Sequence, residues 1–200
     1  RDNAIKIGAI REKIEKISTS AEEKFILITS LIYAADKVAN TVGHYDAYRE
    51  KLDMKGKLEL LLPNIDYSKN KNNKVYCMDS NILANEIKGD VVYIDPPYNS
   101  RQYSDTYHLL DNLALWKKPE VFGKAKKMDR SHIKSKYCSK DAVLEFQDLI
   151  TKLNTKHIIV SYNNTGNTKH GRSNAKISFN QIKNILMKKG KTEINQIDFK

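Results

Sequence analysis

The sequence is poor in the residues that build glycine-rich loops, disulfide frameworks and membrane spans. Its 200 residues include 8 glycines, 4 prolines and 2 cysteines, and no glycine-rich phosphate-binding pattern occurs. The two cysteines, at positions 77 and 138, form no pairing or metal pattern, so we expect a reduced, cytoplasmic protein. The longest apolar stretch, residues 25–35, is too short to cross a bilayer. We therefore predict no membrane partner. The five histidines have no ligand spacing, so we also predict no metal.

The chain begins with a helical pattern and continues as an alternation of short strands and helices. Isoleucines recur at helical spacing over residues 5–17, and Ser20 with Glu23 forms a capping-box signature for a second helix. Further along, short β-branched runs alternate with amphipathic stretches such as residues 141–153 and 178–189. This alternation predicts an α/β protein with a parallel sheet.

A buried strand is predicted at residues 91–94, and the four residues after it are the ones that suggest a chemistry. Asp95-Pro96-Pro97-Tyr98 lies where ligands bind in open α/β sheets, outside the carboxyl end of a strand. The prolines stiffen the turn, so the Asp95 carboxylate and the Pro96 carbonyl are two acceptors with fixed directions. Such a pair suits the exocyclic amine of a nucleobase, and Tyr98 offers a face for stacking. The alternative is an ordinary Pro-Pro turn with an exposed tyrosine.

The tetrad and its continuation resemble the DNA adenine methyltransferases of bacterial restriction-modification systems. The similar stretches are the tetrad itself, Asn99-Ser100-Arg101-Gln102-Tyr103, Tyr107-His108-Leu109-Leu110 and Ser161-Tyr162-Asn163-Asn164. The resemblance implies a Rossmann-like fold that depends on S-adenosylmethionine, partial in this chain and preceded by a helical segment. It also implies methyl transfer to the 6-amino group of a flipped-out adenine in double-stranded DNA.

The resemblance also assigns roles to individual residues. Asp95 and Pro96 would accept the hydrogens of the adenine amine, while Pro97 keeps the turn rigid and Tyr98 stacks on the base. Asp95 would lie close to the methyl donor as well. The residues after the tetrad that are candidate DNA contacts are Asn99, Arg101, Gln102 and Tyr103. Asn163 either lines the target-base pocket or builds a turn.

A second cofactor contact is predicted one strand earlier. Residues 75–80 have the pattern of a short strand that ends at Asp79 and Ser80, followed by a short helical segment. Their place resembles the family's contact with the adenine of the cofactor. The alternative is that Asp79 or Ser80 caps the following turn.

Basic residues dominate the segment that follows the candidate site. The chain has 35 lysines and arginines against 24 acidic residues, a net charge of +11, and residues 117–140 hold nine basic residues against two acidic ones. Such a run is either a solvated surface or a phosphate-binding loop. Because it follows the tetrad along the chain, we favour contact with DNA. The candidate residues are Lys124, Lys126, Lys127 and Arg130.

The resembled enzymes normally carry an aromatic-x-Gly loop that lies against the cofactor, and none of the eight glycines forms it. The chain opens inside a helical pattern and closes in a strand-like segment at residues 192–200. We therefore expect a fragment, or a split subunit whose cofactor site a second chain completes.

We predict two regions and one principal function. Residues 1–62 form a helical segment that is scaffold or part of a target-recognition region, and residues 63–200 form the catalytic α/β part. The predicted function is site-specific DNA adenine methylation. A catalytically silent DNA-binding or complementation subunit, and methylation of RNA or of a protein amide, stay open as alternatives.

Overall fold

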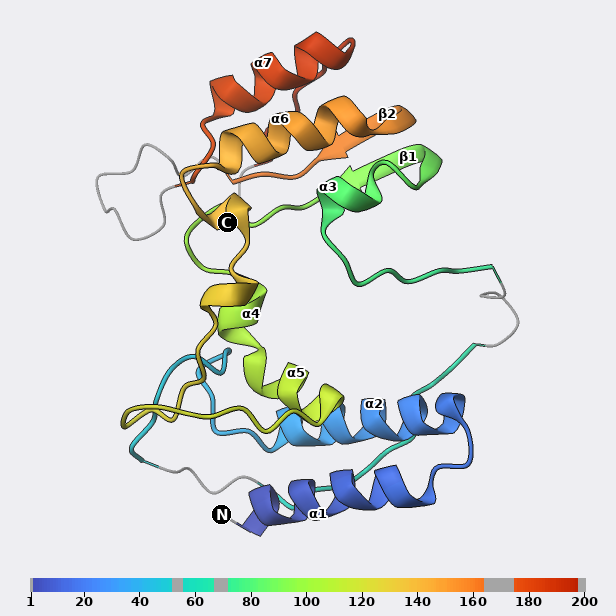
Figure 1. The fold of residues 1–200 in the computed structure, drawn as a ribbon, viewed down its shortest axis with the longest axis vertical. Helices are drawn as coiled ribbons and strands as arrows, with labels where there is room; N and C mark the ends of the chain where they lie inside the picture. Colours follow the sequence, from blue (N-terminus) through green and yellow to red (C-terminus); the bar gives the residue numbers. More distant parts are fainter. Residues whose placement is uncertain (1, 52–55, 67–71, 164–174, 198–200) are drawn as a thin grey trace. The chain divides into compact units, whose positions relative to one another are not determined.

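The computed structural model describes residues 2–51, 56–66, 72–163 and 175–197 (Figure 1). The chain forms two compact units, one of residues 1–74 with 103–133 and the other of residues 75–102 with 134–200. These units differ from the predicted division at residue 62, because residues 103–133 pack with the helical beginning of the chain. No helix in the described parts is both long and apolar enough to span a membrane.

The first unit is helical, as predicted for its beginning. It contains α1 (Asp2–Ile17), α2 (Ala21–Lys37), α4 (Tyr103–Thr106), α5 (His108–Leu115) and the 3-10 turn η1 (Ser131–Ile133). Ile14, Ile28 and Leu31 form its core, against which Leu113 and Ala114 of α5 pack.

The N-cap of α2 is the predicted one. The hydroxyl of Ser20 accepts a hydrogen bond from the Glu23 amide at 3.1 Å. In a capping box, the Glu23 carboxylate would accept from the amide of the N-cap residue, Ser20. Here it accepts from the amide of the preceding residue, Thr19, at 2.7 Å.

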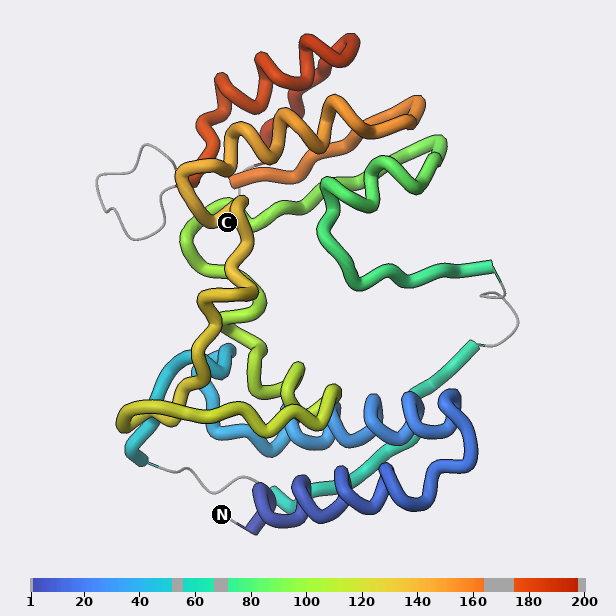
Figure 2. Tube along the Cα trace, viewed as in Figure 1, coloured from blue at the N-terminus to red at the C-terminus, as the bar shows by residue number. Residues whose placement is uncertain are grey.

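The second unit contains a two-stranded parallel sheet with helices, which confirms the predicted α/β class. It contains α3 (Ser80–Leu83), β1 (Lys88–Ile94), the 3-10 turn η2 (Lys136–Cys138), α6 (Ala142–Lys152), β2 (Asn154–Val160) and α7 (Phe179–Lys189). The register pairs Lys88 with Asn154 and Ile94 with Val160, so the two strands end together. Their traces run side by side in Figure 2.

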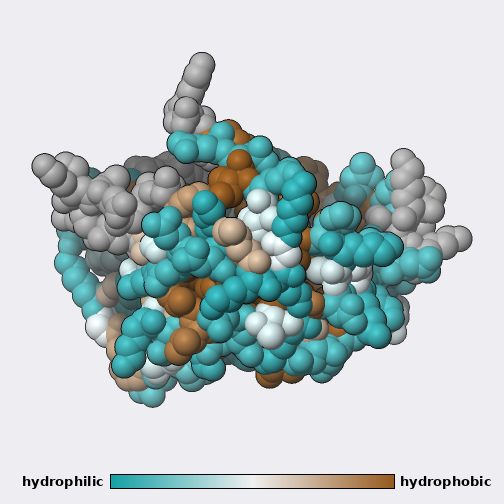
Figure 3. Space-filling model, turned by 90° about the horizontal axis from the view of Figure 1, so that it is seen from above, coloured by the Kyte–Doolittle hydropathy of each residue, from teal (hydrophilic) through white to brown (hydrophobic). Residues whose placement is uncertain are grey.

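The core of this unit lies between one face of the sheet and α6 and α7. Phe146 and Ile150 of α6 and Ile182 of α7 are buried, and Val92 and Ile158 of the strands pack against them. The residues of the opposite sheet face, Val91, Tyr93 and Ile159, are each more than half exposed. On the face that Figure 3 shows, hydrophilic side chains predominate, with smaller hydrophobic groups between them.

The described residues of two predicted strands form no strand. Residues 75–78 have no regular structure, and Val75 is 95% exposed, so no neighbouring strand covers it. Residues 191–197 are also irregular, and the rest of the predicted C-terminal strand lies outside the described residues. A strand requires a hydrogen-bonded neighbour, which alternation of side chains alone does not supply.

We predict that Phe146→Ala lowers the free energy of unfolding by about 3–5 kcal/mol, because it removes a fully buried aromatic ring. Leu144→Ala in the same helix is the control. Leu144 is 68% exposed, so its truncation should change stability by no more than about 0.5 kcal/mol. Urea unfolding of both variants measures the difference, and equal losses would contradict this account of the core.

Candidate active site

The structure brings together the two polar motifs that follow β1 and β2. Beyond the paired ends of the strands, the amide of Ser161 donates to the carbonyl of Ile94 at 2.9 Å. The pairing therefore continues by one step, and Asp95 begins its turn beside Ser161. The two motifs therefore begin at the same edge of the sheet, although Asn164 lies outside the described residues.

The backbone and the ring of Tyr98 are held by the second motif and the segment after it. The carbonyl of Tyr98 accepts from the Lys176 amide at 2.7 Å and from the Tyr162 hydroxyl at 3.3 Å. The rings of Tyr98 and Tyr162 meet edge to face, with centroids 6.4 Å apart and planes at 78°. Tyr98 remains 38% exposed, so part of its ring is open to a ligand.

The hydroxyl of Tyr162 is a fixed donor. It accepts from the Ile177 amide at 3.1 Å while it donates to Tyr98. Burial raises the pKa of Tyr162, which keeps the hydroxyl protonated.

The acidic residue of the tetrad is exposed, whereas the proline after it is buried. Asp95 is exposed, Pro96 is buried and Pro97 is half-buried. A carboxylate anchored to a buried turn is accessible to a ligand and yet held by rigid backbone.

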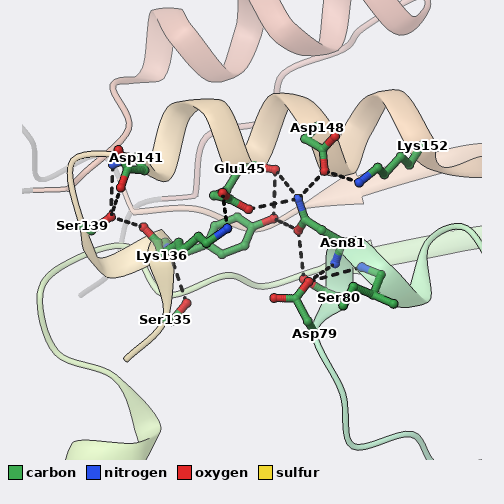
Figure 4. A network of polar contacts seen from close by, with 12 residues as sticks. Asp79, Ser80, Asn81, Ser135, Lys136, Ser139, Asp141, Glu145, Asp148 and Lys152 are labelled. Atoms are coloured by element: carbon green, nitrogen blue, oxygen red, sulfur yellow. Dashed lines mark hydrogen bonds and ion pairs between the residues drawn. The ribbon is translucent and has the colours of Figure 1, made fainter. Parts of the chain in front are cut away.

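The predicted cofactor residue Asp79 is the N-cap of α3. Its Oδ1 accepts from the amides of Asn81 at 2.8 Å and Ile82 at 3.2 Å, which confirms the capping alternative (Figure 4). Capping uses only one of the two oxygens of this carboxylate. Both bonds are made by Oδ1, and the residue is exposed, so Oδ2 can still accept from a ligand.

The residues after the tetrad differ in accessibility. The Asn99 side chain accepts from the Arg101 amide at 2.8 Å and so shapes the turn, while Arg101 itself is exposed. Gln102 is only 7% exposed, and its Oε1 accepts from the Ser135 amide at 2.6 Å. This bond fixes the side chain of Gln102, which the sequence predicts as a contact with DNA, against the Ser135 backbone. Tyr103 is exposed and stacks on Tyr107 with centroids 6.0 Å apart.

Comparison with known proteins decides the family. The model of the D12 class N6 adenine-specific DNA methyltransferases matches residues 1–165 of this chain. The chain is a member of this class. Its tetrad and the Asn-x-Arg-Gln-Tyr continuation both lie within the matched region.

Curated relatives of this D12-class chain are methylases, several of them type II. The modification methylase StsI of Streptococcus sanguinis is 40% identical over 170 residues, which cover 82% of this chain and 26% of the relative. The type II methyltransferase M.NlaIII of Neisseria lactamica is 35% identical over 205 residues, which cover 100% of this chain and 58% of the relative. The type II methyltransferase M.FokI of Planomicrobium okeanokoites is 39% identical over 168 residues, which cover 83% of this chain and 26% of the relative.

The chain thus spans between about a quarter and three fifths of the length of these relatives. No solved structure gives a significant match to it.

Several basic residues of the segment in this D12-class chain are paired with acidic residues of the first unit. Lys124 forms an ion pair with Glu50, and Lys127 lies 2.7 Å from Asp46. Lys126 is exposed and forms no ion pair with another described residue.

Arg130 is the most enclosed of the four basic candidates. It pairs with Asp46 at 3.2 Å and Asp105 at 2.9 Å, and its side chain is 15% exposed. Burial pushes the pKa of Asp46 up, but Lys127 and Arg130 outweigh this effect and hold the pKa below its ordinary value. The charge of the Arg130 guanidinium is therefore compensated by two carboxylates of the same unit.

Sequence reasoning missed two residues beside Asp79. Asn81 is 5% exposed and makes hydrogen bonds to α6 (Figure 4). The Tyr137 hydroxyl of η2 donates to Asn81 Oδ1 at 2.8 Å. Nothing in the local pattern indicates this contact, because the two residues are 56 positions apart. The one local feature that could have drawn attention to Tyr137 is its place as a tyrosine within the basic segment.

We predict that Arg130→Gln destabilises the chain by about 1–3 kcal/mol, because it leaves Asp46 and Asp105 without their shared partner. Lys126→Gln removes the same charge from the same segment and serves as the control. It should change stability by less than about 0.5 kcal/mol. Thermal unfolding of both variants distinguishes them, and equal stability of the Arg130 variant and the unchanged chain would refute the assignment.

Proposed function

We propose that this chain is the catalytic part of a site-specific DNA adenine methyltransferase. It would transfer the methyl group of S-adenosylmethionine to the 6-amino group of adenine in double-stranded DNA. The observation that carries the proposal is the exposed Asp95 carboxylate at the end of β1, followed by a partly buried Pro-Pro turn and an anchored Tyr98. The family and the names of the relatives support the same reaction. Both cysteines are free, and the cytoplasm remains the predicted compartment.

The proposed chemistry depends on orientation more than on strong basicity. The lone pair of the adenine amine is delocalised into the ring, so the amine is a weak nucleophile. Asp95 and the Pro96 carbonyl would accept its two hydrogens and favour a tetrahedral nitrogen with its lone pair directed at the methyl group. The N–C bond forms as the C–S bond of the sulfonium breaks, and the amine then loses one proton to Asp95 or water. Tyr98 would stack on the extruded base.

S-adenosylmethionine supplies the electrophilic methyl group, and two segments of this chain suit its binding. Asp79 is exposed, and its Oδ2 can accept from an adenine amine, with Ser80 beside it. The carboxylate of Asp95 would face the donor from the end of β1. Arg101, Asn99, Tyr103 and Asn163 remain proposed contacts with DNA or its flipped base, and Lys126 is the accessible phosphate contact of the basic segment.

We also propose that β1 and β2 belong to a larger, Rossmann-like sheet. Parallel sheets in α/β proteins are covered on both faces, whereas Val91, Tyr93 and Ile159 here are more than half exposed. A further layer, from a longer chain or a second one, would bury this face and bring the missing cofactor loop. Two strands alone form a marginal sheet, which supports the same proposal.

Asp95→Ala is expected to lower kcat by at least about 10²-fold to 10³-fold, because one of two acceptors for the amine is lost. Asp90→Ala is the matched control, since Asp90 is an exposed aspartate of the same strand that pairs with Lys156. Transfer of radiolabelled methyl groups to mixed-sequence duplex DNA measures both variants. Salt-sensitive DNA binding without labelling by the unchanged chain would favour the silent subunit instead.

Tyr98→Ala and Lys126→Gln are expected to separate base handling from phosphate binding. Loss of the ring should lower kcat and leave nonspecific duplex affinity within about 2-fold, since stacking acts on the flipped base. Lys126→Gln should lower the slope of log affinity against log salt by about 0.9 and leave kcat at saturating DNA unchanged. Titrations at several salt concentrations, together with turnover, test the pair. Parallel losses of affinity and turnover in both variants would reject the separation.

A further inference from the structure

We propose that Tyr137 is a positioning residue for the cofactor-binding segment, because its hydroxyl holds Asn81, whose own backbone amide holds the Asp79 carboxylate. This inference rests on the proposed function, in which Asp79 contacts the cofactor. It adds to that function a residue outside the recognised motifs, located in the basic segment that precedes α6.

The first step is the contact between Tyr137 and Asn81. Tyr137 is buried, and its hydroxyl oxygen lies 2.8 Å from Asn81 Oδ1 and 3.2 Å from the carbonyl oxygen of Glu145. Both neighbours are acceptors, and the single hydroxyl proton is best placed for the nearer one. Burial raises the pKa of Tyr137, so the group stays a donor.

The second step is that the Asn81 side chain has partners at both ends of its amide. Its Nδ2 donates to the Glu145 carbonyl at 2.9 Å and to Asp148 Oδ2 at 2.8 Å, while Oδ1 accepts from Tyr137 (Figure 4). A buried amide with both ends bonded has one low-energy orientation. The backbone N–H of the same residue is the donor 2.8 Å from Asp79 Oδ1. The anchored Asn81 side chain therefore fixes the residue whose N–H is the nearer of the two donors to the Asp79 carboxylate.

The third step connects the same turn to the loop after the tetrad. The Ser135 amide donates to the buried Gln102 side chain, and the Cys138 thiol lies 3.8 Å from the Arg101 carbonyl. Residues 135–138 thus contact the segment after Tyr98 on one side and the Asp79 segment on the other.

A purely structural role for Tyr137 would reside in its ring, which is part of the hydrophobic core around Phe146. The positioning role resides in the hydroxyl. Tyr137→Phe keeps the ring and removes only the oxygen, so it separates the two roles. Tyr162→Phe is the matched control, because it removes a part-buried hydroxyl from the same unit that bonds to Tyr98 and not to the Asp79 segment.

The experiment measures binding of S-adenosylmethionine by calorimetry and steady-state methyl transfer. Tyr137→Phe is expected to weaken cofactor binding and raise its KM roughly 3-fold to 10-fold, the equivalent of one hydrogen bond, with kcat at saturating cofactor within about 2-fold. Tyr162→Phe should leave cofactor affinity within about 2-fold. An unchanged cofactor affinity in Tyr137→Phe, or an equal decrease in both variants, would overturn the inference.

Hydrogen exchange of the Asn81 and Ile82 amides gives a second readout that needs no cofactor. Both amides donate to Asp79, so exchange at these two sites should be about 3-fold to 10-fold faster in Tyr137→Phe and unchanged in Tyr162→Phe. Equal exchange in the unchanged chain and Tyr137→Phe would overturn the inference. Failure of the unchanged chain to bind the cofactor would instead contradict the proposed function, and the exchange result would still decide the role of Tyr137.

Discussion

The register of β1 against β2 is the constraint on which the candidate site depends. Ile94 pairs with Val160, and both side chains face the core under α6 and α7. Burial alternates along the chain from Tyr93 to Pro96, so the alternation of the strand continues into the turn. A slip of one residue would turn Asp95 toward the apolar core and expose Ile94. The hydrophobic pattern of the strands therefore specifies the exposure of the carboxylate.

Basic residues that cluster along the sequence are partly neutralised in the fold by carboxylates from distant segments. The excess of basic residues is greatest at residues 117–140, yet Lys124, Lys127 and Arg130 are paired with Glu50 and Asp46, which precede them by more than 70 residues. A run of lysines indicates a positive surface only where no distant carboxylate neutralises it. These ion pairs connect residues 124–130 with acidic residues of the first unit, and the remaining exposed charge is smaller and more local than the composition indicates.

Local patterns predicted the elements whose stability is local or dictated by a continuous apolar face. The strand at residues 91–94, the amphipathic helix at 141–153 and the helix that begins at Ser178 all formed, the last with a complete capping box to Gln181. The strand at residues 75–80 failed because alternation specifies a face but not a partner. The burial of Gln102 and the return of residues 103–133 to the helical unit depend on contacts between distant segments, which one sequence does not reveal.

The Asp79 segment shows why polar contacts, and not apolar packing, determine local geometry at this edge of the fold. α3 has four residues, too few for an isolated helix to be stable, and its Ile82 is exposed. Apolar packing there is limited, with Ala84 at its C-cap as the buried apolar residue. Non-directional burial of so small a side chain leaves the rotation of the segment loosely specified. The Asn81 amide removes that freedom, because hydrogen bonds are directional and a buried amide loses free energy whenever one of its ends is unpaired. For the ligand contact proposed for Asp79, which requires a defined angle, directional bonds from the amide and the tyrosine hydroxyl hold the carboxylate better than a larger apolar contact would.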